Sequence, residues 1–132
     1  KQNKLEQNKN KKDMEKNSQE LMEFIAKTLR DKLAFDVEVI KVGEVSIIAD
    51  YFVIASGRTD SHVRSLFDYV DEGVKKTFDL DPLHTEGVET AKWTVMDYGS
   101  VIVHIFRNDE REFYSIEKLW AEAPRVELEE NN

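Results

Sequence analysis

ADYFVIASG, residues 49–57, is the stretch that decides the fold, because it is apolar without interruption from Tyr51 to Ala55. A short apolar run without alternation is typical of a strand that is buried on both faces and lies in the middle of a sheet. Gly57 ends the run, and Asp60 or Ser61 can then cap a helix. The stretch therefore predicts a central strand that leads directly into a helix.

The segments on either side of this strand complete the first half of the fold. Before it, DVEVIKV (36–42) alternates and predicts another strand. A first helix is expected to begin near Asn17, which can cap it while Glu20 reaches back in a capping box. After the central strand, apolar residues recur at helical spacing on one face, at Val63, Leu66, Phe67, Val70, Val74 and Phe78.

WTVMDYGSVIVHIF, residues 93–106, predicts two further strands around a tight turn. If Tyr98 and Gly99 form the turn, Asp97 opposes Ser100 and Trp93 opposes His104. Opposed residues share a face of the sheet. One face then carries Trp93, Val95, Ile102, His104 and Phe106, and the other carries Thr94, Met96, Val101, Val103 and Ile105. A three-residue turn would shift this register.

The remaining segments predict loops and a closing helix. DLDPLHTEG (79–87) is expected to be a loop with a short extended piece, RNDERE (107–112) a charged turn, and FYSIEKLWAEAP (113–124) a short helix. The expected fold class is α/β, with a single mixed sheet of about five strands flanked by helices. We expect residues 1–16 to be a disordered leader or tag, residues 17–124 to form one domain, and residues 125–132 to be an acidic tail.

The charge of the chain is −8 over 132 residues, and it is unevenly spread. Residues 1–13 hold five lysines and two acids, which leaves 14 basic and 25 acidic residues in positions 14–132. An acidic body repels phosphate groups, so we expect little direct contact with nucleic acid and a basic protein as the partner. The absence of cysteine excludes disulfides, thiol catalysis and cysteine-based zinc sites. No membrane-spanning run or signal peptide is recognised, which predicts a soluble, cytoplasmic protein without membrane contact.

His104 is the residue of the hairpin that first suggests chemistry. The other histidines, His62 and His84, are at no metal-ligand spacing from it, and no nucleophile motif is present. The favoured interpretation is therefore a half-buried histidine packed on Trp93, although contact with a partner stays open. Asp79 and Asp81 form an acidic pair of the kind that holds magnesium, but such residues in a loop are usually solvated turn residues.

Large aromatic residues gather in the last third of the chain, at Trp93, Tyr98, Tyr114 and Trp120. They lie among the charged residues Asp97, Arg111 and Glu117, and this composition is typical of interface hot spots. Core packing is the simpler explanation for Trp120. For Trp93, core packing and partner contact are equally favoured.

The sequence resembles the ribosomal silencing factor family (RsfS, also called Iojap-like). The matching pieces are ADYFVIASG, the pair Glu86–Gly87, WTVMDYG, VIVHIF, and Arg111 followed by FYSIEKLWAEAP. They occur in the order and spacing of the family and cover about residues 17–124. Ser61 and Ser100 depart from the pattern, since many members have a basic residue and an aspartate at these positions.

The resemblance implies a nucleotidyltransferase-like fold without catalytic activity, metal or cofactor. It implies a protein that binds the large ribosomal subunit through ribosomal protein fourteen, blocks joining of the small subunit and represses translation in nutrient limitation or stationary phase. In organelle relatives the same interaction is tied to assembly of the large subunit. Carried onto this chain, the resemblance places the partner-binding surface at Trp93, Met96, Asp97, Tyr98 and Gly99, with His104, Tyr114 and Glu117 nearby.

Two alternatives to this function stay open. One is an enzyme of the nucleotidyltransferase fold that uses Asp50, Asp79 or Asp81 with magnesium and a nucleotide. The other is a homodimeric scaffold, because apolar residues on both faces of VIVHIF leave surface for self-association when the protein is free.

Overall fold

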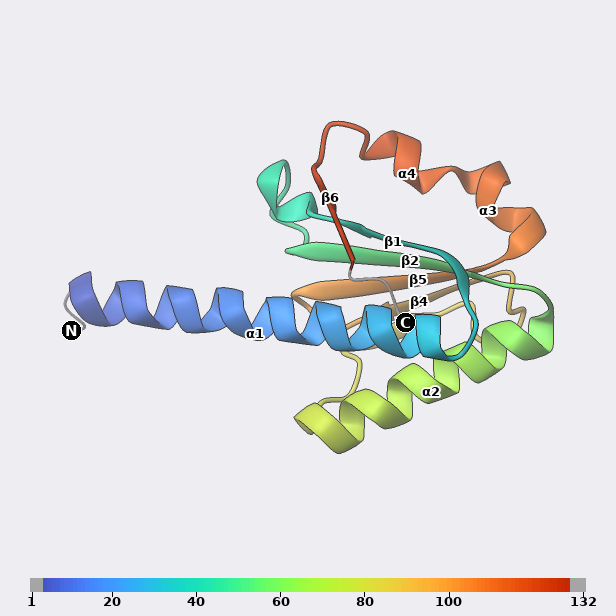
Figure 1. The fold of residues 1–132 in the computed structure, drawn as a ribbon, viewed down its shortest axis with the longest axis horizontal. Helices are drawn as coiled ribbons and strands as arrows, with labels where there is room; N and C mark the ends of the chain where they lie inside the picture. The colour runs from blue at the N-terminus through green and yellow to red at the C-terminus, as the bar shows by residue number, and fades with distance from the viewer. Residues whose placement is uncertain (1–3, 129–132) are drawn as a thin grey trace.

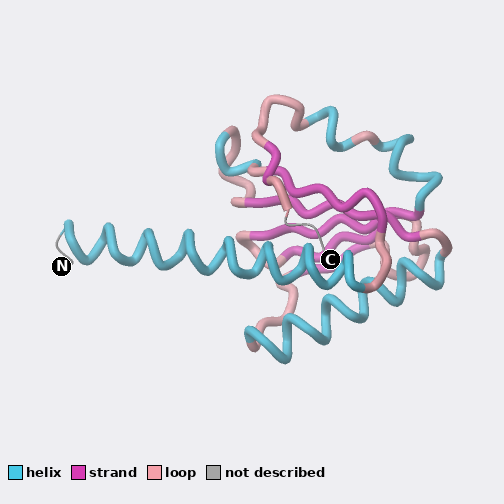
Figure 2. Tube along the Cα trace, viewed as in Figure 1, coloured by secondary structure: helices cyan, strands magenta, loops and turns pink. Residues whose placement is uncertain are grey.

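The computed structural model describes residues 4–128, which form one mixed sheet between two layers of helices (Figures 1 and 2). The elements in chain order are α1 (Lys4–Asp31), β1 (Phe35–Ile40), the 3-10 helix η1 (Val42–Glu44), β2 (Tyr51–Gly57), α2 (Asp60–Phe78), β3 (His84–Glu86), β4 (Trp93–Asp97), β5 (Val101–Arg107), α3 (Asn108–Tyr114), α4 (Ile116–Leu119) and β6 (Arg125–Val126). No helix within residues 4–128 combines the length and the apolar character that crossing a bilayer requires.

The sheet confirms the predicted mixed α/β architecture, with six strands in the order β3-β4-β5-β2-β1-β6. β2 and β5 pair in parallel at the centre, and the other neighbours pair antiparallel. The strand beyond the expected five is β6, which pairs with Val39 and Ile40 of β1. Part of the segment expected to be an acidic tail therefore extends the sheet.

The central position of β2 explains why its sequence does not alternate. Val53 and Ala55 pack in the core under α1 and α2, whereas Phe52 and Ile54 pack on the other face under α3 and α4. β5 divides its side chains in the same way. Both strands are covered on both faces, so apolar residues occupy successive positions.

α2 follows β2 as predicted, but its cap is Thr59 rather than Asp60 or Ser61. The Thr59 Oγ1 accepts a hydrogen bond from the backbone N–H of His62, over 3.1 Å. The predicted apolar stripe is confirmed, since Val63, Leu66, Val70 and Val74 are all buried.

α1 begins at Lys4, not near Asn17, and its first turns extend beyond the sheet (Figure 1). The structure thus differs from the expectation of disorder over residues 4–16. Lysine, glutamine and glutamate are good helix formers, and no glycine or proline interrupts the chain before Asp31. Once Leu21, Ile25 and Leu29 anchor the helix in the core, it continues toward the N-terminus.

The segment expected to be a charged turn and one short helix forms two helices instead. α3 begins at Asn108, directly after β5, and the left-handed backbone of Ser115 (φ 46°, ψ 44°) separates it from α4. The change of direction at Ser115 lays α4 across the sheet (Figure 1). Ile116 is buried there against the second face of the sheet, which is the face opposite α1 and α2.

Candidate partner-binding surface

β4 presents one face to the core and the other to the outside. Thr94 and Met96 are buried beneath the α1–α2 layer, whereas Trp93, Val95 and Asp97 alternate with them and are partly exposed. The period of two in a strand produces this division. Gly99 in the turn after β4 and Tyr114 of α3, whose ring packs on Trp93, lie next to these residues. We call the whole set the β4 surface, formed by Trp93, Val95, Asp97, Gly99 and Tyr114.

The register of the β4–β5 hairpin differs by two residues from the predicted one. Trp93 pairs with Phe106, and Val95 rather than Trp93 pairs with His104. The Tyr98 backbone N–H donates to the Val101 carbonyl over 2.9 Å, so Gly99 and Ser100 form the turn. A shift of two keeps every side chain on its predicted face.

Trp93 lies in a cluster of aromatic rings on the second face of the sheet. Its ring stacks on Phe106 with the centroids 5.1 Å apart, and the Tyr114 ring lies 4.6 Å away. The indole Nε1–H donates to His104 Nδ1 over 3.1 Å. The sequence-based contact between Trp93 and His104 is therefore present, but it joins diagonal rather than opposed residues.

His104 is a buried, neutral side chain that orients Trp93. It is 7% exposed, and the ring of Phe52 lies 4.7 Å from its own. Because Nδ1 accepts from Trp93, the proton of the neutral ring is on Nε2, which has no hydrogen-bond partner among the described residues. Burial lowers the pKa of His104 from 6.5 to about 4, against the opposing effect of the Glu117 carboxylate. A ring in this state supports Trp93 and is a poor general base.

The lowered pKa of His104 predicts a pH-dependent stability. The unfolded ring takes up a proton below pH 6.5, but the folded ring does so only near pH 4, so acidification favours unfolding in this window. We expect the wild type to lose up to about 3 kcal/mol of unfolding free energy relative to His104→Gln as the pH falls through the window. Urea unfolding of both proteins at several pH values measures this difference, and parallel pH profiles would contradict the assignment.

Met96 and Tyr98 are a correction to the expected contact set. Met96 is fully buried, and Tyr98 is 8% exposed within the core on the α1–α2 side. Burial raises the pKa of the Tyr98 hydroxyl, with contributions from Asp71 and Asp81. Neither side chain reaches the face that carries Trp93, so both are structural residues.

The other expected residues lie on or beside the β4 surface. Asp97 Oδ1 accepts the Gly99 backbone N–H over 2.7 Å, which fixes the turn. Tyr114 is 39% exposed beside Trp93. Glu117 is partly buried and accepts from Arg111 Nε over 2.5 Å. Through this bond to Arg111, Glu117 stabilises the structure behind the β4 surface.

Arg111 is a structural residue whose role the sequence did not reveal. It is 9% exposed and donates to the Asp36 carbonyl, to Ser56 Oγ over 3.0 Å and to Glu38 over 3.3 Å, in addition to Glu117. These bonds tie α3 and α4 to β1 and β2. One signal was visible, since Ser56 is a polar residue in an otherwise apolar strand.

The aspartates of the enzyme alternative are distributed between two separate contacts. Asp79 and Asp81 both pair with Lys75, over 3.1 and 3.3 Å. Asp50 accepts from Ser18 Oγ over 2.7 Å. Within residues 4–128 no three histidine or carboxylate side chains are grouped as metal ligands. The three aspartates of this alternative are thus engaged with Lys75 and Ser18 in the structure.

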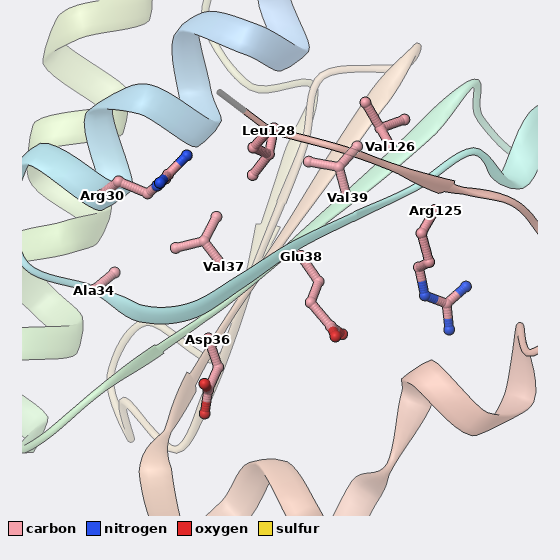
Figure 3. Close-up of a pocket in the computed structure, with 9 residues that line it drawn as sticks. All are labelled: Arg30, Ala34, Asp36, Val37, Glu38, Val39, Arg125, Val126 and Leu128. Carbon is pink, nitrogen blue, oxygen red and sulfur yellow. The ribbon is translucent and has the colours of Figure 1, made fainter. Parts of the chain in front are cut away.

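A groove of about 480 Å³ lies between the end of α1, β1 and β6 (Figure 3). Val37 and Val39 point to one side of β1, and Asp36 and Glu38 point to the other (Figure 3). Glu38 is already paired with Arg111, and groups of both charges line the groove. We assign no ligand to it.

Comparison with known proteins gives consistent matches over most of the chain. A family model described as "Ribosomal silencing factor during starvation" matches residues 15–132. The chain is 37% identical to "Ribosomal silencing factor RsfS" of Halalkalibacterium halodurans over 112 residues, which cover 85% of this chain and 95% of that protein. It is 33% identical over 101 residues to the mouse protein "Mitochondrial assembly of ribosomal large subunit protein 1", covering 75% of this chain and 44% of the mouse protein.

A solved structure supports the same relationship. A crystal structure of a Bacillus halodurans protein superposes with a TM-score of 0.72 at 34% identity, covering 83% of this chain and 99% of that one. The arrangement of sheet and helices described above is thus shared with a relative of similar length.

Proposed function

The chain belongs to the ribosomal silencing factor (RsfS) family, and on this basis we propose that it binds the large ribosomal subunit through ribosomal protein fourteen, blocks joining of the small subunit and lowers translation when nutrients are limiting. Family membership supports a role in ribosome silencing or assembly and in the regulation of translation. The specific partner and the block of subunit joining are the proposed part. The site of action would be the cytoplasm, where free large subunits occur.

The observation that carries this proposal is the β4 surface on an acidic body. Trp93 is partly exposed, yet stacking and the bond to His104 hold its ring in one orientation. A rigid aromatic residue with a charged neighbour such as Asp97 is the usual anchor of a protein interface. Residues 14–132 carry an excess of acids, and complementary charge speeds encounter with a basic ribosomal protein.

The proposed mechanism is steric and requires no chemical step. Once the β4 surface is seated on the large subunit, the sheet and its helical layers occupy volume that the approaching small subunit needs. The effect on translation would then follow from occupancy, with no turnover. Release would restore subunit joining, because nothing is modified.

A role in large-subunit assembly is the second candidate, and the name of the mouse relative favours it. The same surface would serve both roles. Loss of the protein would lower the amount of mature large subunits if it acts in assembly. Under the silencing role, loss would raise the fraction of joined ribosomes in starved cells and leave subunit amounts unchanged.

A subunit-joining experiment tests the silencing proposal. Purified large and small subunits are mixed with increasing protein and separated on a sucrose gradient, and we expect joined ribosomes to decrease while the protein migrates with the large subunit. Asp97→Asn keeps the oxygen that accepts from Gly99 but removes the charge, so it is expected to act more weakly than the wild type. Asp68→Asn, the same change on exposed α2, is the matched control. An unchanged joined fraction at saturating wild-type protein would contradict the proposal.

A further inference from the structure

The loop between η1 and β2 exposes apolar side chains that the core does not use. Ile47 is as exposed as in an extended chain, at 104%, and Ile48 is 58% exposed. Val45 is 49% exposed in the same loop. Single exposed apolar residues are ordinary, but three within four successive positions indicate an interaction surface. We call residues 45–48 the isoleucine loop.

The isoleucine loop is held in place by its own hydrogen bonds. The Gly43 backbone N–H donates to the Asp50 carbonyl over 3.1 Å and closes the base of the loop. The Ser46 N–H donates to the Val42 carbonyl over 2.9 Å, and Ser46 Oγ accepts from the Ile48 N–H over 3.2 Å. Buried Val42 and Ala49 anchor both ends in the core. A fixed loop loses little conformational entropy on binding, which favours a docking role.

The isoleucine loop lies at the turn end of the β4 surface. The backbone N–H groups of Asp50 and Tyr51 both donate to the carbonyl of Ser100, over 2.8 and 3.1 Å, so the base of the loop is attached to the β4–β5 turn. The loop rises on the side of the sheet that carries α3 and α4 (Figure 1). The Trp93 ring packs against the cluster on this same side, which includes Ile116 of α4. From Trp93, β4 runs about 13 Å toward this turn, at ~3.3 Å per residue.

The charges around the isoleucine loop decide between two occupants. Positions 41–50 and 97–100 hold three carboxylates, on Glu44, Asp50 and Asp97, and one ammonium group, on Lys41. The ammonium group pairs with Glu44 over 3.4 Å, so these two segments together keep a net negative charge. A second copy of this chain would bring acids against acids, because a two-fold interface joins the same patch to itself. A basic partner with an apolar patch meets complementary charge instead.

From these observations we propose that Ile47 and Ile48 form a second anchor for the ribosomal protein that the β4 surface binds. The proposal rests on the proposed function. It requires a partner that carries an apolar patch surrounded by lysine or arginine residues. This patch must lie about one length of β4 away from the point where the partner contacts Trp93. Two separated anchors would fix the orientation of the protein on the large subunit, which steric exclusion of the small subunit requires.

The test is the double variant Ile47→Ser/Ile48→Ser, measured by co-sedimentation with purified large subunits. We expect its affinity to fall about tenfold or more, because two apolar contacts are lost. Its thermal unfolding should match the wild type, since both side chains are exposed. Leu33→Ser is the matched control, because Leu33 is 75% exposed in the turn after α1. Figure 1 shows this turn at the opposite end of the sheet from the loop between η1 and β2. The single variant Ile47→Ser repeats the test if the double variant is unstable.

Each outcome of this test has one meaning. Unchanged binding of the double variant, in a set where Trp93→Ala does weaken binding, overturns the second anchor and leaves the proposed function in place. Failure of the wild type to bind large subunits overturns the proposed function itself. Sedimentation velocity of the free protein tests whether the loop binds a second copy of this chain instead. If the double variant loses self-association but keeps its affinity for subunits, the loop contacts a second copy and the proposal is wrong.

Discussion

Replacement of Trp93 by alanine is expected to weaken binding to the large ribosomal subunit about 30-fold or more, which corresponds to ~2 kcal/mol and is typical of an aromatic hot spot. Trp93 is the largest side chain of the β4 surface, and its orientation is fixed by Phe106, Tyr114 and His104. Alanine removes the contact area of the indole ring and leaves a recess in the surface that the partner would contact. Co-sedimentation or fluorescence titration with purified large subunits measures the effect.

The control for this variant must separate lost contact from lost stability. Trp93→Ala also removes packing on Phe106 and leaves His104 Nδ1 without its donor, so we expect a loss of about 2 kcal/mol of unfolding free energy. Phe24→Ala is a matched control, because Phe24 is a partly buried aromatic residue packed on Phe78 at the opposite face of the sheet. It should lower stability to a similar extent and leave subunit binding unchanged. Equal binding by both variants would contradict a contact between Trp93 and the large subunit.

Tyr98 is left unchanged in this test for a structural reason. It was expected to contact the partner beside Trp93, but its side chain is buried on the other face of the sheet. Its removal would open a cavity in the core and lower stability without reporting on the surface. Asp97 and Tyr114 are the residues to combine with Trp93 in further variants.

Gly87→Ala is expected to be the most destabilising single change near this surface, at about 3–5 kcal/mol. Gly87 has a φ of +74°, and a Cβ placed there would lie 2.0 Å from the backbone carbonyl oxygen of Trp93. No rotamer relieves a clash with backbone, so the turn before β4 must move. Because the displaced atom belongs to Trp93, binding to the large subunit should weaken together with stability.

Gly99→Ala provides the comparison that isolates the clash. Gly99 also has a positive φ, of +87°, but a Cβ there meets nothing closer than a methyl group of Leu83, at 3.4 Å. Only the backbone strain remains, and it should cost about 1 kcal/mol. Urea unfolding of both variants gives the two values. If the two variants prove equally stable, the tight approach of Gly87 to Trp93 is not present in solution.

The main elements of the fold could be predicted because their sequences carry strong local patterns. β2 is an uninterrupted apolar run, and α2 repeats apolar residues at helical spacing. The hairpin faces were also predictable, because alternation survives an even shift in register. Its turn was misplaced because tyrosine and glycine were taken as the central pair. Gly99 instead occupies the first central position, with Asp97 bonded to its N–H, and this places the positive φ on glycine.

The candidate partner-binding surface could be predicted only in part. The alternation along β4 already separates Met96 from Trp93, so a contact set that contains both residues joins opposite faces of the sheet. Trp93, Asp97, Gly99 and Tyr114 remain on the surface after this correction. The network of Arg111 was not predictable, because it reaches Asp36 and Ser56 from a distant part of the chain. Such contacts follow from topology rather than from local pattern.

The parallel pairing of β2 with β5 determines how late in synthesis the centre of the sheet can form. Partners in this pair, from Tyr51 with Val101 to Gly57 with Arg107, are about fifty residues apart in the chain. Pairing over such a separation closes a long loop and is slow compared with helix formation. While a translating ribosome still holds β5 in its exit tunnel, α1, β1 and β2 have been made but the centre of the sheet is missing. Because β4 pairs with β5, the β4 surface can form only after β5 has left the exit tunnel of the ribosome that makes the chain.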